Sequence, residues 1–379
     1  MMFIIAAITA MTLSGLVGLQ LSPAPSFATL PIALMMLGTV VSTLPASLLM
    51  AKIGRRLGFM SGAFIGGIGG GLVSVAGIAI HSFTIFCIGN VLLGLYQGFA
   101  MYYRFAAVDV ASPAFRSRAI SLVLTGGVAA AFLGPWNASA LIDLLDGAHM
   151  AGPYLVVAIQ AVSVMMLLSL LRVPYSGEPH HETYARPLKV IIRQSNFIVA
   201  LISASIGYAI MILLMSATPL AMRAHGYSME EVAFIMQWHV LGMFVPSFFT
   251  GNLIARFGVG LVLLLGSLIL AGATIIADAG HTLNHYLLSL ILLGVGWNFL
   301  FVGGTSLLST THTEEERGKV QGVNDFVIFS LVAFGSLLSG QLLHLLGWEK
   351  LNLSLLPFIL VVALLGLWLS LVQRGRVVA

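Results

Sequence analysis

Two apolar stretches of the chain contain methionine and histidine side chains at the spacing of one helical turn. The first has Met211 and Met215, and the second has His239 and Met243. A separation of four residues places both side chains of a pair on one face of a helix. Thioether sulfur is a soft ligand that prefers Cu(I), and imidazole also binds copper, whereas Mg²⁺, Ca²⁺ and Mn²⁺ prefer oxygen ligands. The four residues are therefore candidate ligands of a copper ion.

The two pairs are placed symmetrically about a turn. Tyr227 lies midway between Met211 and Met243, and also midway between Met215 and His239. In an antiparallel helical hairpin, residues equally distant from the turn lie at similar depth, so the pairs would form two rungs about 6 Å apart. This placement predicts a path on which one ion is passed inward in two steps.

Packing is the alternative interpretation of the methionines. Methionine commonly fills apolar cores, and with 17 methionines in 379 residues about one Met-x-x-x-Met pair is expected from composition alone. His239 favours a functional role, because an ionisable residue in the middle of a span is a functional candidate by default. From the residues alone, both interpretations stay open.

The elements that must position these side chains are membrane-spanning helices. Of 379 residues, 59% are hydrophobic and only 8% are charged, whereas about a quarter of the residues of a soluble domain are charged. The apolar residues form long uninterrupted runs, which is typical of spanning helices and not of the alternating strands of a β-barrel. We therefore expect an all-α membrane protein. The single cysteine, Cys87, excludes a disulfide framework within the chain, and a net charge of +4 does not by itself indicate a nucleic-acid partner.

Twelve apolar stretches are long enough to cross a bilayer. They lie at 1–21, 28–50, 59–80, 84–108, 118–142, 151–173, 196–221, 230–254, 259–279, 285–309, 319–345 and 353–373. One long polar segment, 174–195, separates an N-terminal six-helix half at 1–173 from a C-terminal half at 196–379. We expect this segment to be a cytoplasmic loop.

Lysine and arginine gather on one side of the predicted spans. Those that lie between the spans are in the even-numbered connections or near the C-terminal end, with Arg223 and Lys350 as the exceptions. Because positive residues are retained on the cytoplasmic side, both termini are expected to be cytoplasmic.

The two halves repeat short sequence patterns. The segment Ala-Lys-Ile-Gly that ends at Gly54 is matched by Ala-Arg-Phe-Gly ending at Gly258, 204 positions later. Two further matches, at offsets of 201 and 200, join 116–118 with 317–319 and Gly94 with Gly294. Similar offsets at three places indicate a duplicated six-helix unit.

The first repeat also resembles a family signature. Residues 47–56, Ser-Leu-Leu-Met-Ala-Lys-Ile-Gly-Arg-Arg, are similar to the G-x-x-x-D-R-x-G-R-R pattern of the major facilitator superfamily. Ser47 and Ala51 stand where the pattern has glycine and aspartate. The resemblance implies two pseudo-symmetric halves of six helices each and transport by alternating access.

A gating contact is expected around this signature. In place of the missing aspartate, Asp325 or Asp109 would face the basic residues of the signature. The residues with this predicted structural and gating role are Lys52, Gly54, Arg55, Arg56, Asp109 and Asp325.

Within that superfamily, the methionine and histidine pattern resembles one group in particular. Met-x-x-x-Met at 211–215 followed by His-x-x-x-Met at 239–243 is similar to the motifs of the CcoA-like copper importers, the CalT group. The resemblance implies that these four residues bind the metal, and that copper is imported across the bacterial inner membrane for haem–copper oxidase assembly. Copper, expected as Cu(I), would be the transported substrate and not a cofactor. A copper chaperone partner is left unidentified.

Further candidates and alternatives complete the predictions. Lower-ranked residues of the substrate pathway are Met11, Met35, Met36 and Asn298. The alternative function is a carrier, importer or drug exporter, of a small organic solute, with the methionines as apolar cavity lining. A receptor or oxidase-assembly partner that does not transport is a further alternative. Enzyme motifs such as a nucleotide-binding loop or a catalytic triad are not present in the sequence, so we do not expect an enzyme.

Overall fold

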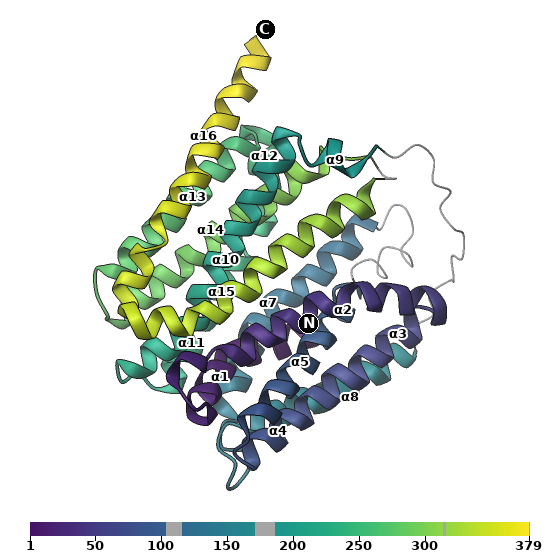
Figure 1. The fold of residues 1–379 in the computed structure, drawn as a ribbon, viewed down its shortest axis with the longest axis vertical. Coiled ribbons are helices and arrows are strands. Elements are labelled where there is room, and N and C mark those ends of the chain that lie inside the picture. Colours follow the sequence, from purple (N-terminus) through teal and green to yellow (C-terminus); the bar gives the residue numbers. More distant parts are fainter. Residues whose placement is uncertain (104–115, 171–185, 314–315, 379) are drawn as a thin grey trace. The chain divides into compact units, whose positions relative to one another are not determined.

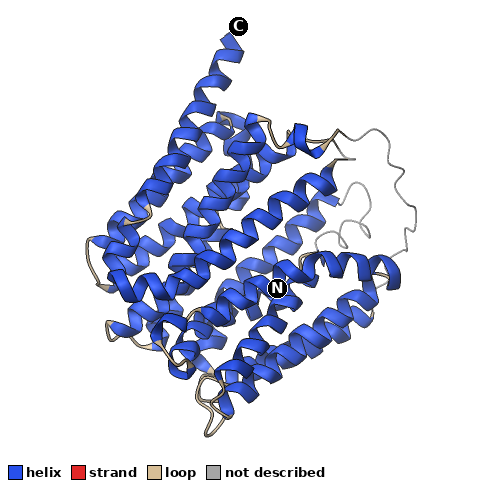
Figure 2. Ribbon diagram, in the orientation of Figure 1, coloured by secondary structure: helices blue, strands red, loops and turns tan. Residues whose placement is uncertain are grey.

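The computed structural model describes residues 1–103, 116–170, 186–313 and 316–378. Within these ranges the chain is helical and contains no strand (Figure 2). The helices of the first part are α1 (Met2–Leu21), η1 (Pro25–Phe27), α2 (Leu30–Ile53), α3 (Arg55–Ser61), η2 (Gly62–Gly69), α4 (Gly70–Ala79), α5 (Phe83–Ala100), α7 (Arg116–Ala140) and α8 (Gly152–Ser169). Those of the second part are α9 (Leu188–Ile191), α10 (Ser195–Ala224), α11 (Met229–Phe244), α12 (Ser247–Phe257), α13 (Val259–Asp278), α14 (Leu283–Ser309), α15 (Arg317–Leu353) and α16 (Leu356–Val378).

The described helices lie at the predicted spans, although two of the spans are joined in one helical stretch. Ten helical stretches in the described part of the chain are long and apolar enough to cross a membrane. The last of them, Lys319–Val372, has 54 residues and joins the eleventh and twelfth predicted spans across a break at Gly347, where φ is 75°. Helix α7 covers the fifth predicted span. The predicted all-α membrane fold is thereby confirmed, and the protein is an integral membrane protein.

The chain forms two compact units that do not follow the chain order strictly. The first contains Met1–Glu178 with Ser216–Gln237 and Ser336–His344, and the second contains Pro179–Met215, Trp238–Gly335 and Leu345–Ala379. In the first, α5 packs against both α2 and α4. In the second, α13 packs against α14 and also against α16, and the ribbons of α13 and α16 run side by side in Figure 1. The predicted division at 174–195 stays a prediction.

The repeated sequence pattern is accompanied by a repeated backbone conformation. Gly54 ends α2 with φ 84° and ψ 156°, and Gly258 ends α12 with φ 82° and ψ 154°. Only glycine adopts such a conformation readily, because a Cβ would crowd the backbone there. The two matched glycines therefore form the same turn in each half.

Helix packing in the first unit depends on glycines at the crossing of α2 and α5. A Cβ on Gly38 would lie 2.4 Å from the carbonyl oxygen of Val91, and a Cβ on Gly94 would lie 2.0 Å from that of Met35. Small residues at such positions let two helix backbones approach closely.

The corresponding helices of the second unit cross in the same way. A Cβ on Gly242 would lie 2.7 Å from the carbonyl oxygen of Ile291, and a Cβ on Gly294 would lie 2.6 Å from that of His239. These four residues are the counterparts, at offsets of 204 and 200, of the four that pack in the first unit. His239 thus occupies the place that Met35 has in the other half.

Candidate functional site

The four predicted ligand residues are all buried. Met211 and Met215 lie on α10, and His239 and Met243 lie on α11. His239 is 0% exposed. The polar contacts that the structure gives to α11 at these positions run to α14, and they do not join one of the four residues to another.

His239 is held by a backbone carbonyl of α14. Its Nδ1 lies 2.8 Å from the carbonyl oxygen of Leu290. Because a carbonyl oxygen only accepts hydrogen bonds, Nδ1 must carry the proton, and in the neutral ring Nε2 is then an acceptor. Nε2 is buried and has no hydrogen-bond partner among the described residues.

The eighth span is interrupted next to this histidine. Helix α11 ends at Phe244 and α12 begins at Ser247, with Pro246 between them. Proline cannot donate a backbone hydrogen bond and does not continue a helix. The backbone at Pro246 stays in the helical region, with φ −61° and ψ −23°, so α11 and α12 form one span with a proline inside it, and neighbouring protein groups satisfy the freed backbone.

Asn298 of α14 forms hydrogen bonds to the residues on both sides of Pro246. Its Nδ2 donates to the carbonyl oxygen of Met243 at 2.7 Å and to Ser247 Oγ at 2.6 Å. Thr250 Oγ1 donates to Asn298 Oδ1 at 2.7 Å. Both the oxygen and the nitrogen of the Asn298 amide are used in these contacts. In the structure, this predicted pathway residue therefore links α14 to the residues around Pro246.

Helices α10, α14 and α15 together form a cluster of aromatic side chains. The Tyr208 ring centroid lies 5.4 Å from that of Trp297, 5.5 Å from that of Phe301 and 6.0 Å from that of Phe329. The Trp297 and Phe301 rings are stacked, with centroids 5.1 Å apart and planes at 9°. Trp297 Nε1 is buried and has no partner among the described residues. The sequence does not reveal that these rings lie together, although Tyr208, Trp297 and Phe301 all stand in apolar spans.

The first unit contains a buried polar network of its own. Ser14 Oγ on α1 donates to Asn90 Oδ1 on α5 at 2.8 Å and lies 2.8 Å from Tyr154 Oη on α8. All three side chains are fully buried. Asn137 on α7 donates to Thr9 Oγ1 at 3.0 Å. This network was also missed, and the signal that would have found it is the pair of asparagines in apolar spans.

The remaining predicted pathway residues belong to this unit. Met11 lies on α1, and Met35 and Met36 lie on α2. All three are buried. Their role in transport stays a prediction.

The predicted gating residues are only partly placed. Lys52 and Arg56 are exposed and Arg55 is half-buried, on either side of the turn at Gly54. Asp325 on α15 accepts a hydrogen bond from Asn324 at 3.1 Å and belongs to the second unit, whereas the basic residues belong to the first. Asp109 lies outside the described residues. The predicted contact across the two halves therefore stays a prediction.

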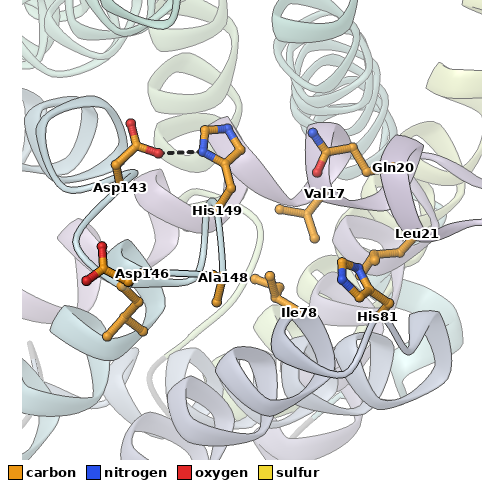
Figure 3. Close-up of a pocket in the computed structure, with 11 residues that line it drawn as sticks. Val17, Gln20, Leu21, Ile78, His81, Asp143, Asp146, Ala148 and His149 are labelled. Carbon is orange, nitrogen blue, oxygen red and sulfur yellow. Dashed lines mark hydrogen bonds and ion pairs between the residues drawn. The ribbon is translucent and has the colours of Figure 1, made fainter.

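A pocket of about 580 Å³ opens at the connection after α7, in the first unit. Figure 3 shows His149 pointing to Asp143, with Nδ1 and Oδ1 2.6 Å apart. Gln20, His81 and Asp146 also line it. Even so, no group of three or more histidine, cysteine or acidic side chains in the described part of the chain is arranged to hold a metal.

The segment before α10 is tied to the start of α15. Arg186 Nη2 lies 2.6 Å from Glu316 Oε2, and its Nε and backbone N–H both donate to Glu316 Oε1, at 2.7 and 2.9 Å. The Arg186 guanidinium lowers the pKa of the Glu316 carboxyl to about 2, from an ordinary value of 4.5, and the backbone N–H of Thr313 contributes in the same direction. Glu316 is nearly fully buried, so this charged group is held by its partners.

Comparison with known proteins places the chain in a family. The sequence model of the Major Facilitator Superfamily matches residues 1–236 and 199–377. The riboflavin transporter RfnT of Brucella anthropi is 42% identical over 367 residues, which are 96% of this chain and 92% of that protein. Two uncharacterized MFS-type transporters of Bacillus subtilis, YdeG and YddS, are 29% and 26% identical; the matches cover 96% and 90% of this chain and 87% and 82% of the two relatives.

These findings correct the predicted substrate. Copper as the transported partner is wrong, because the relative at 42% identity, matched over nearly the whole length, is a transporter of an organic molecule. The copper prediction depended on four residues at a common helical spacing, and methionine at such spacing also packs apolar helices. With copper excluded, the link to oxidase assembly is not supported either. The same holds for the metal-ligand role predicted for Met211, Met215, His239 and Met243. The broader prediction of a carrier is confirmed: the chain belongs to the Major Facilitator Superfamily.

Proposed function

We propose that this protein carries riboflavin, or a flavin closely similar to it, across the membrane. The observation that carries the proposal is the 42% identity to the riboflavin transporter RfnT over 96% of the chain. This choice corresponds to the alternative of a small organic solute.

The aromatic cluster of the second unit supports a flat, conjugated solute. A flavin has a planar three-ring system, and such rings stack favourably on aromatic side chains at about 1–3 kcal/mol per contact. Trp297 and Phe301 already lie parallel at 5.1 Å, and Tyr208 lies against both. We infer that these side chains contact the ring system during transport.

The methionines suit the same solute as apolar lining. Met211, Met215 and Met243 are buried in spans seven and eight. Methionine is flexible and polarisable, and it packs favourably against aromatic rings. We propose that these three side chains adapt to the ring system as the carrier changes conformation, with the two halves alternately exposing the solute.

The protein is proposed to lie in the bacterial inner membrane with both termini in the cytoplasm. The lysine and arginine residues of the even-numbered connections support this orientation. A tag at either terminus should then be accessible only after the cytoplasmic side is opened.

Transport of labelled riboflavin tests the proposal. The full-length protein is reconstituted into vesicles, and flux is measured in both directions against vesicles without protein. Saturable flux that unlabelled riboflavin inhibits is expected, and no flux in either direction would overturn the proposal. Trp297→Ala should raise KM roughly tenfold through the loss of one stacking contact. Trp368→Ala is the matched control, because Trp368 is 45% exposed on α16 of the same unit.

A further inference from the structure

The helix crossing at His239 does not require a histidine. In the first unit, Gly94 of α5 packs against the backbone of Met35, and in the second, Gly294 of α14 packs against the backbone of His239. The glycines correspond in the two halves, and so do Met35 and His239. Because methionine occupies the same place in an equivalent crossing, packing alone does not explain the histidine.

The ring orientation of His239 is determined by one contact. Nδ1–H donates to the Leu290 carbonyl oxygen at 2.8 Å, so Nε2 presents a lone pair. The backbone of His239 also lies close to α14, since a Cβ on Gly294 would lie only 2.6 Å from the His239 carbonyl oxygen. The acceptor is thus held in a defined place by α14.

That acceptor is buried and has no partner in the part of the chain that the structure describes. His239 is 0% exposed, and Nε2 has no hydrogen bond among the described residues. Leaving a buried acceptor unpaired costs about 1–3 kcal/mol. The amide of Asn298, on the facing helix, has both ends occupied by protein groups, whereas Nε2 of His239 has no such partner in the described part of the chain.

The group that His239 lacks is a hydrogen-bond donor. We propose that Nε2 of His239 accepts a hydrogen bond from an N–H group of the transported solute and thereby selects it. This inference rests on the proposed function, and for a flavin it assigns the contact to the imide N–H of the ring, at position N3. In a flavin this imide N–H is the hydrogen-bond donor of the ring system, so it is the group that an imidazole acceptor would recognise.

The location of His239 fits a solute site. It stands ten residues into the 29-residue span Met229–Phe257, about 15 Å from the beginning of that span. Met243 lies one turn further on the same face, directly before the break between α11 and α12. Carriers bind their solutes near the middle of the membrane.

A pair of solutes and a pair of variants test the inference. Riboflavin is compared with 3-methylriboflavin, which cannot donate from N3, in vesicles that contain the full-length protein. The wild type should favour riboflavin in kcat/KM by about 5–150-fold, the range of one such buried hydrogen bond. His239→Met removes the acceptor and retains the side chain that packs in the other half, and it should transport both solutes with a ratio under twofold. His239→Gln, which offers an amide oxygen, should recover part of the preference.

The outcomes separate this inference from the proposed function. Absence of riboflavin flux in the wild type overturns the proposed function. Riboflavin flux with equal transport of the methylated solute overturns only the role of His239, as does a preference that His239→Met retains. Protein amount and thermal stability in detergent are measured for both variants, so a folding defect is recognised independently of the ratio.

Discussion

Replacement of Asn298 by leucine should destabilise the protein by breaking the support of the interrupted span. The substitution removes the two bonds from Nδ2 to the Met243 carbonyl oxygen and to Ser247 Oγ, and the bond that Thr250 donates to Oδ1. Thr250 keeps a second acceptor, the Pro246 carbonyl oxygen at 2.7 Å. The Met243 carbonyl is the group most affected, because the break removes its ordinary helical partner.

The magnitude follows from these contacts. A buried carbonyl left unpaired costs about 1–3 kcal/mol. Each of the other two hydrogen bonds contributes roughly 0.6 kcal/mol, the average for side-chain bonds between membrane helices. The expected loss in the free energy of unfolding is therefore about 2–4 kcal/mol.

The assay is reversible unfolding in mixed detergent, followed by helix content or by intrinsic fluorescence. Asn352→Leu is the matched control, since Asn352 is equally buried but its Nδ2 donates to Trp348 within its own helix, at 2.8 Å. The control should lose about 1 kcal/mol or less. If Asn298→Leu loses no more than Asn352→Leu, the role assigned to Asn298 at the break is refuted.

Two further changes test the other contacts. Because the pKa of Glu316 is lowered from 4.5 to about 2 by Arg186, the ion pair should stabilise the protein fully above pH 4.5 and lose its effect as the pH falls toward 2. Glu316→Gln should lower the thermal midpoint at pH 7 and flatten this acid dependence. An unchanged pH profile would contradict the assignment. Gly294→Val should abolish folded protein or reduce it severely, since a Cβ there meets the His239 carbonyl oxygen at 2.6 Å. Gly272→Val on α13 is the control and should be tolerated, because a Cβ at Gly272 has no described atom within 4 Å. Size-exclusion chromatography compares the yields of the two variants, and equal yields would show that the close crossing is not needed.

The fold was predictable because the bilayer restricts the chain strongly. Each span must satisfy its own backbone hydrogen bonds and remain apolar over about 20 residues. Runs such as that of α13, with no charge between Val259 and Ile276, therefore identify helices without knowledge of their neighbours. The interruption at Pro246 was less predictable, because it depends on Asn298, a residue 52 positions away that occupies the freed carbonyl.

The solute was not predictable from the four residues on spans seven and eight. Their spacing correctly indicates which side chains share a helix face, and the structure buries all of them. Spacing does not indicate what each side chain contacts, however. His239 was interpreted as a metal ligand from its spacing alone. Its Nδ1 is engaged by the Leu290 carbonyl oxygen, a contact that no local pattern in the sequence reveals.

Comparison of the two halves separates packing from function at the level of single residues. Where the halves agree, as in the close contacts of Gly94 and Gly294, the shared residue is explained by helix approach. Where the two halves differ, the helix crossing in one half shows that the helices can pack without the side chain found in the other half. Met35 is replaced by His239 in this way. A residue that duplication shows to be dispensable for packing, and that presents an unpaired buried acceptor, is therefore explained better by the solute than by the fold.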